Sequence, residues 1–124
     1  MNKITSTDSK KVYDLEERTF LFAKNVCLFC KKLPRTISNI EYVRQLIRAS
    51  GSVGSNYIEV NKALSKKDFV YRIKIGRKES KESVFWLRLI KDTNPIDFAN
   101  EALALLNEAN ELRKIFLSII EKSK

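Results

Sequence analysis

Apolar side chains recur along this chain every three or four residues, the spacing of one face of an α-helix. The pattern is clearest between Ser65 and Asp92, where apolar and basic residues gather on opposite sides. The apolar side holds Phe69, Ile73, Gly76, Val84, Leu87 and Ile90. The opposite side holds Lys67, Lys74, Arg77, Lys78, Lys81 and Arg88, with Tyr71 and Phe85 among them. This segment predicts a helix with one face in a core and another suited to an anionic partner.

Four helices are predicted, and each has a start signal. In a capping pair, a polar residue precedes an acidic one by three positions. Three such pairs occur: Asp14 with Glu17, Ser38 with Glu41, and Ser65 with Asp68. Pro95 starts the fourth helix, because proline at the first helical position loses no needed hydrogen bond. The first three helices are expected over residues 14–33, 39–64 and 65–92, and Leu33-Pro34 ends the first.

The short connections between these helices make sequential helices antiparallel neighbours. A chain of 124 residues fits one domain, and three Gly and two Pro are few for a turn-rich β fold. The prediction is an all-α, up-down-up-down antiparallel four-helix bundle over residues 13–124. Residues 1–12 are expected to form a flexible N-terminal arm.

The first helix is apolar beyond a single face. Its core stripe is Leu15, Phe22, Val26, Phe29 and Leu33. Phe20, Leu21, Cys27 and Leu28 fall outside this stripe. A helix that is apolar nearly all round favours burial on more than one side, so Phe20, Leu21 and Leu28 are predicted to form an oligomer interface. The alternative is scattered exposed apolar residues, which are normal on soluble proteins.

The net charge of +9 comes from 24 Lys and Arg against 15 Asp and Glu. Such an excess favours polyanions such as nucleic acid, although it also serves solubility alone. The segment from Ser65 to Asp92 carries nine basic residues against four acidic ones, whereas the fourth helix is net acidic. Tyr71 and Phe85 are candidates for stacking on unpaired bases, unless they belong to a second packing surface whose rim the lysines solvate.

A polar stripe follows the second helix. Its members are Gln45, Arg48, Ser52, Asn56 and Glu59, spaced by three or four residues. One interpretation is a solvated face. The other is a hydrogen-bonded layer, within the bundle or across subunits, in which Arg48 pairs with Glu59, Glu79 or Glu82.

The sequence offers little for catalysis. It contains no histidine, which removes the usual general base and the usual catalytic pairs. Cys27 and Cys30 form a C-x-x-C inside a helix and lack the further ligands of a zinc site, so they are interpreted as structural thiols. Gly51 and Gly54 are expected to allow close helix approach, against Gly76. We expect no enzyme activity, no metal and no cofactor.

Neither a signal peptide nor a membrane span is expected. Residues 1–11 are polar and basic without an apolar region, and no apolar run approaches the roughly 18 residues of a span. The expected location is the cytoplasm.

Several spaced residues resemble a known family. Gln45, Arg48-Ala49, Ser52-Val53, Asn56 and Glu59 resemble the second helix of the four-helix-bundle proteins encoded in intervening sequences of bacterial large-subunit ribosomal RNA genes. The matches to the third helix are Ser65, Asp68-Phe69, Arg77-Lys78-Glu79, Glu82 and Trp86-Leu87. Asp14-Leu15 and Leu33-Pro34 match its first helix. Gly51, Gly54 and Val60 depart from the family pattern, which suggests altered packing.

The resemblance implies a non-enzymatic bundle that forms homo-oligomers, with pentameric rings among members. A related branch comprises the accessory proteins of diversity-generating retroelements, which are basic pentamers that bind nucleic acid and a reverse transcriptase. The leading hypothesis is therefore an oligomeric bundle that binds RNA, or another nucleic acid, non-specifically through the basic face of the third helix. The alternative is an oligomeric scaffold that binds an acidic protein partner.

Overall fold

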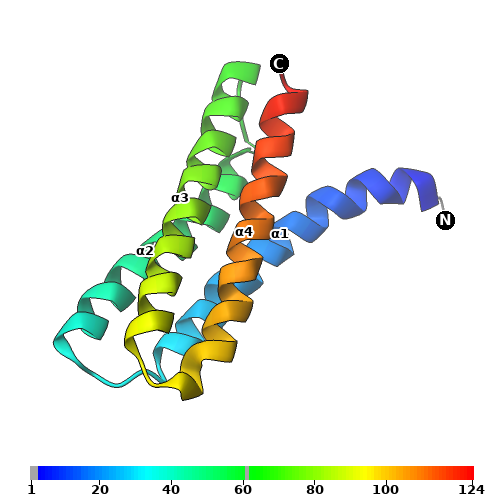
Figure 1. Cartoon of the computed structure of the whole chain (residues 1–124). Helices are drawn as coiled ribbons and strands as arrows, with labels where there is room; N and C mark the ends of the chain where they lie inside the picture. The colour runs from blue at the N-terminus through cyan, green and yellow to red at the C-terminus, as the bar shows by residue number, and fades with distance from the viewer. Residues whose placement is uncertain (1–2, 61) are drawn as a thin grey trace.

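The computed structural model describes residues 3–60 and 62–124, with side chains described from Leu15 onward. The elements are α1 (Lys3–Cys30), α2 (Ile37–Val60), α3 (Lys66–Thr93), the short 3-10 helix η1 (Ile96–Phe98) and α4 (Ala99–Lys122). Each of α2, α3 and α4 packs against the helix before it and runs in the opposite direction, and α4 also contacts α1 (Figure 1). The predicted all-α, up-down-up-down antiparallel four-helix bundle is confirmed.

All four helices contribute to one core. The predicted stripe of the first helix is buried along its length, from Leu15 through Phe22, Val26 and Phe29 to Leu33. The apolar side of α3 contributes Ile73, Leu87 and Ile90, and α4 contributes Leu112 and Phe116. Each fully buried large apolar side chain stabilises the bundle by about 1.5–3 kcal/mol relative to an exposed one. The helical spacing of apolar residues therefore predicted the inward faces of the first and third helices correctly.

The helix starts agree with the predicted caps in one of three cases. The Ser65 hydroxyl accepts a hydrogen bond from the Asp68 N–H at 3.1 Å, as expected of an N-cap. For α2 the predicted cap Ser38 is wrong, because the Thr36 hydroxyl accepts the Asn39 N–H at 3.1 Å. Asp14 lies inside α1, so it does not cap that helix either.

The first helix starts much earlier than predicted. Residues 3–12, expected to belong to an arm, are helical, and Figure 1 shows this end of α1 projecting beyond the other helices. Met1 and Asn2, also part of the predicted arm, lie outside the described residues. The sequence before Asp14 contains neither proline nor glycine, so no strong helix breaker precedes the predicted cap.

A pair of asparagines joins the two connections at one end of the bundle. The Asn39 amide donates to the Asn94 side-chain oxygen at 2.8 Å, and the Asn94 amide donates back to Asn39 at 2.9 Å. Asn39 also donates to the Pro34 carbonyl, and Asn94 donates to the Ile90 carbonyl. The buried Asn39 is therefore satisfied, and the α1–α2 loop is fixed against the end of α3.

The three glycines do not meet, which corrects the predicted contact between Gly51, Gly54 and Gly76. A Cβ atom on Gly54 would lie 3.3 Å from the Thr19 hydroxyl oxygen of α1, so this glycine permits close packing of α1 on α2. A Cβ atom on Gly76 would lie 3.2 Å from the Phe116 ring of α4. Gly51 faces open space, with nothing within 4 Å of its Cβ position. Each close approach therefore involves a different pair of helices.

Candidate nucleic-acid interface

The outward side of α3 carries the predicted basic residues. Its members, which we call the α3 basic face, are Lys67, Tyr71, Lys74, Arg77, Lys78, Lys81, Phe85 and Arg88. Arg77 is half-buried and the others are exposed. The apolar positions that alternate with them point into the core, so the helical period itself sorts the two sets onto opposite sides.

Most cations of this face lack a counter-charge. Within the described part of the chain, Lys67, Lys74, Arg77, Lys81 and Arg88 form no ion pair. Lys78 lies 3.9 Å from a Glu82 carboxylate oxygen, a weak exposed pair. The Arg77 Nε atom is buried and has no hydrogen-bond partner among the described residues. The face therefore presents a concentrated positive charge that its own helix does not neutralise.

A groove of about 490 Å³ runs along part of this face. It is lined by Lys74, Arg77, Lys78, Lys81, Glu82, Phe85 and Trp86. Trp86 was not among the predicted site residues, although its position next to Phe85 was a usable signal. Lys67, Tyr71 and Arg88 lie outside the lining, so the structure brings together only five of the eight predicted residues.

Aromatic rings form one wall of the groove. The Phe85 and Trp86 rings meet edge to face, with centroids 5.0 Å apart and planes at 80°. Trp86 also packs on Tyr42 of α2, with centroids 5.9 Å apart. Phe85 is nevertheless 55% exposed. Tyr71 is in a different environment, because the Arg72 guanidinium carbon lies 5.9 Å from its ring centroid.

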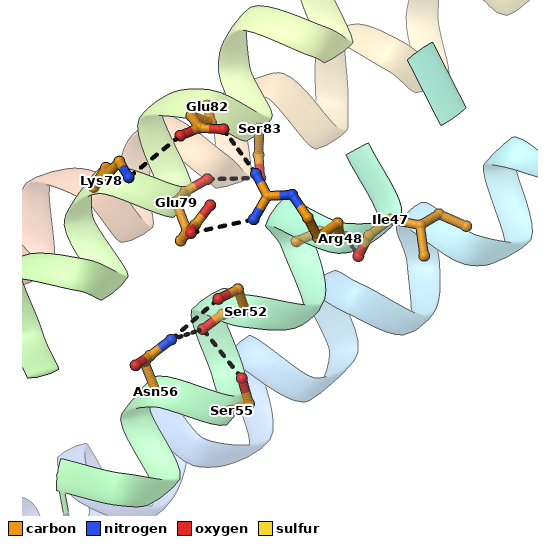
Figure 2. Close-up of polar contacts among 10 residues, drawn as sticks. Ile47, Arg48, Ser52, Ser55, Asn56, Lys78, Glu79, Glu82 and Ser83 are labelled. Carbon is orange, nitrogen blue, oxygen red and sulfur yellow. Dashed lines mark hydrogen bonds and ion pairs between the residues drawn. The ribbon is translucent and has the colours of Figure 1, made fainter. Parts of the chain in front are cut away.

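Between α2 and α3, Arg48 joins two glutamates (Figure 2). Its guanidinium donates to Glu82 at 2.9 Å and to Glu79 at 3.4 Å. Glu79 is only 6% exposed, and its other carboxylate oxygen is buried without a partner among the described residues. The predicted pairing of Arg48 with α3 is therefore observed within one chain.

The rest of the polar stripe is divided between local bonds and solvent. Asn56 donates to the carbonyl and the hydroxyl of Ser52, and accepts from Arg72 of α3 at 3.3 Å. Gln45 donates to Glu41 at 3.0 Å, and this bond, followed by those from Arg44, lowers the pKa of Glu41. Glu59 is exposed and does not pair with Arg48. The stripe thus combines a hydrogen-bonded layer with a solvated edge.

The predicted interface residues of α1 are all exposed in the single chain. Phe20 is 61% exposed, Leu28 45% and Leu21 40%. Leu21 lines a second groove, of about 380 Å³, between α1 and α4, beside the ion pair of Arg18 with Glu108 at 2.7 Å. These apolar side chains are available for contact with another molecule.

The two cysteines are unpaired and lie inside α1. Cys30 is buried, and burial followed by the proximity of Cys27 raises the pKa of the Cys30 thiol to about 12. This thiol is therefore neutral at physiological pH, which does not suit a nucleophile. Over the described residues, no group of three metal-ligating side chains occurs, and no helix has the length and hydropathy needed to cross a membrane.

The fold and this face define a class of protein: a basic four-helix bundle with an exposed cationic groove. The chain belongs to the 23S rRNA-intervening sequence protein family, whose model matches residues 11–118. It is also similar to a crystal structure described as a protein with unknown function from the S23 ribosomal protein family of Bacteroides thetaiotaomicron VPI-5482. That similarity has 26% identity and a TM-score of 0.77, and covers 86% of this chain and 97% of the other. No curated protein sequence gives a significant match.

Proposed function

We propose that this protein is a non-enzymatic, oligomeric bundle that binds RNA or another nucleic acid through the α3 basic face. The observation that carries the proposal is a row of cations beside an exposed aromatic wall, in which only Lys78 forms an ion pair with another described residue. Contacts to phosphates would dominate, so affinity should fall steeply with salt and depend little on sequence.

The family name supports the choice of RNA as ligand. Members are described as 23S rRNA-intervening sequence proteins, which makes a structured fragment of that RNA the first ligand to test. The charge distribution agrees, because Glu101 of α4 pairs with Lys32 in the turn after α1, and Glu108 of α4 pairs with Arg18 of α1. The net positive charge is thereby concentrated on α3.

Oligomerisation is the second part of the proposal. Phe20, Leu21 and Leu28 expose apolar surface on α1, which favours contact with a second copy of the chain. The family resemblance makes a pentamer the expected assembly. Several weak basic faces in one assembly would gain avidity on a long RNA. We place the protein in the cytoplasm.

A scaffold that binds an acidic protein is the competing function. The same α3 basic face would then contact carboxylates, and the exposed apolar residues of α1 would still build the oligomer. A captured protein partner that remains bound after nuclease treatment would favour the scaffold.

The test is fluorescence anisotropy with a structured ribosomal RNA fragment and an unrelated RNA at two salt concentrations. The variant reverses two exposed lysines of the face, Lys74→Glu with Lys78→Glu. The control makes the same charge change on α4, Lys114→Glu with Lys122→Glu, where both lysines are also exposed.

We expect the α3 double variant to lose at least about tenfold in affinity, with a salt slope smaller by about 1 for each lysine. The α4 double variant should lose much less. Equal losses in the two variants would refute the assignment to α3 and leave only a general charge effect. Absence of binding by the wild-type protein at low salt would remove the RNA proposal altogether.

A further inference from the structure

We infer that the groove on α3 holds unpaired bases, so that the protein prefers single-stranded RNA to duplex RNA. This inference rests on the proposed function and specifies its substrate. It follows from the aromatic wall, which a surface made only for phosphates would not need.

Phe85 has the position of a stacking platform. Its ring is 55% exposed, yet it is held from one side by Trp86, which is itself packed against Tyr42 of α2. The platform is therefore backed by a second helix and does not have to be ordered when a ligand arrives. Aromatic side chains presented in this way bind bases of any sequence through their flat faces.

The cations are arranged along the same groove. Lys74, Lys78 and Lys81 lie on successive turns, and at 1.5 Å per residue the first and last are separated by about 10 Å along the helix. That length corresponds to roughly three nucleotide steps of a stacked strand at 3.4 Å each. The groove volume of about 490 Å³ also lies in the range of small-ligand sites, roughly 300–1,000 Å³.

Arg77 adds a guanidinium at the edge of the groove. Its Nε atom is buried and lacks a hydrogen-bond partner in the described part of the chain, while its side chain lines the groove. A guanidinium is a planar donor that suits both phosphate oxygens and the faces of bases. The groove therefore combines phosphate contacts with base contacts.

A duplex would use only part of this surface. In A-form RNA the bases are stacked inside and the major groove is too deep and narrow for side chains to enter. Lys74, Lys78 and Lys81 would still contact phosphates, but Phe85 would find no base face. An acidic peptide would likewise satisfy the cations and leave the ring without a planar partner.

The experiment compares three ligands that carry nearly the same backbone chemistry: a 12-nucleotide RNA strand, the same strand annealed to its complement, and an abasic strand of equal length. Binding is followed by anisotropy and by intrinsic fluorescence, which comes from Trp86 as the only tryptophan of the chain. We expect the intact strand to bind at least about fivefold more tightly than the abasic strand, the factor for one weakly stacked base. Only strands with free bases should quench Trp86.

Phe85→Leu removes the aromatic face but keeps an apolar side chain against Trp86. This variant should lose the preference for the intact strand, and Phe85→Tyr should retain it. Ile58→Ala is the control, because Ile58 is an exposed apolar side chain on α2 that lies outside both the groove and the α3 basic face. Circular dichroism verifies that each variant keeps its helices.

The outcomes separate this inference from the proposed function. Equal salt-sensitive affinity for all three ligands, with no change in Trp86 fluorescence, would overturn base stacking and leave phosphate binding intact. Tighter binding of the duplex would also overturn it. If none of the ligands binds, both proposals fail. Polyglutamate, as a fourth ligand, tests the acidic-protein alternative. If it binds as tightly as the intact strand without a change in Trp86 fluorescence, base stacking is overturned and an acidic protein becomes the expected ligand.

Discussion

Two charged flanks of α3 differ in what their side chains contact. On the flank that faces α2, Glu79 and Glu82 share Arg48, and Glu79 is almost fully buried (Figure 2). On the outer flank, Lys74 and Lys81 have no ion pair among the described residues. Charges of the first flank support the packing of two helices, whereas those of the second face solvent.

The difference shows that one helix separates its structural charges from its displayed charges. Like charges on one exposed face repel each other, so the outer lysines do not stabilise the bundle. Paired charges between helices belong to the fold, since removal of one partner leaves the other poorly solvated. Substitutions on the two flanks should therefore change different properties: the free energy of unfolding for the α2 flank, and the affinity for polyanions for the outer flank.

The largest stability effect should come from Arg48→Ala. This substitution removes the cation from the buried Glu79 carboxylate, one oxygen of which already lacks a partner in the described chain. Since Arg48 is half exposed, we expect a loss of about 2 kcal/mol in the free energy of unfolding, below the cost of breaking a fully buried pair. Urea unfolding at pH 7 measures this loss in the free energy of unfolding.

Arg44→Ala is the matched control for this prediction. Arg44 pairs with Glu41 within one turn of α2, and both side chains are well exposed, so its loss should be small. If the two arginine variants unfold at the same urea concentration, the contact between α2 and α3 is no more structural than a surface pair. The α2 flank would then not differ from the outer flank in its contribution to stability.

Gly51→Ala should give a smaller effect of the opposite sign. Its Cβ would meet nothing within 4 Å, so the helix propensity of alanine should raise the free energy of unfolding by about 1 kcal/mol. The substitution touches neither charged flank, so RNA affinity should stay unchanged while stability rises. Gly76→Ala is the comparison. A Cβ there would lie 3.2 Å from the Phe116 ring, and this close contact should offset the gain in stability from alanine's helix propensity.

This pair of variants also separates stability from binding. A change in RNA affinity on Gly51→Ala would mean that affinity follows the stability of the bundle. Wild-type affinity at higher stability would support the view that the outer flank binds independently of the packing flank.

The sequence predicted features that depend on a single helix. Burial of Phe22 and Ile73 and exposure of Lys74 follow from a 3.6-residue period, which one segment reveals by itself. Helix starts were less reliable, because Thr36 competes with Ser38 as the cap and nothing before Asp14 breaks the helix. Capping patterns identify candidates, and the surrounding backbone decides among them.

Features that depend on the register between helices were not predictable in the same way. In the sequence, three glutamates were candidate partners of Arg48. Only the packing of α2 on α3 selects Glu79 and Glu82 over Glu59. Trp86 was missed for the same reason, since its role as the backing of Phe85 depends on Tyr42 in another helix. Gly51 and Gly54 were assigned one role, but the structure places only Gly54 against a neighbouring helix.

Lys74→Glu, which should have the smallest effect on stability, tests the outer flank itself. The new carboxylate would lie four residues before Lys78, the favourable order for a helical ion pair, and would relieve repulsion among the lysines. We expect the free energy of unfolding to rise by about 0.2–0.5 kcal/mol at low ionic strength, and the gain to vanish near 1 M salt because of screening. Lys114→Glu on α4 is the control, since it breaks an existing pair with Glu111 and should not stabilise. Destabilisation by Lys74→Glu at low salt would show that Lys74 contributes to the fold, and the outer flank could no longer be treated as charge displayed only for a ligand.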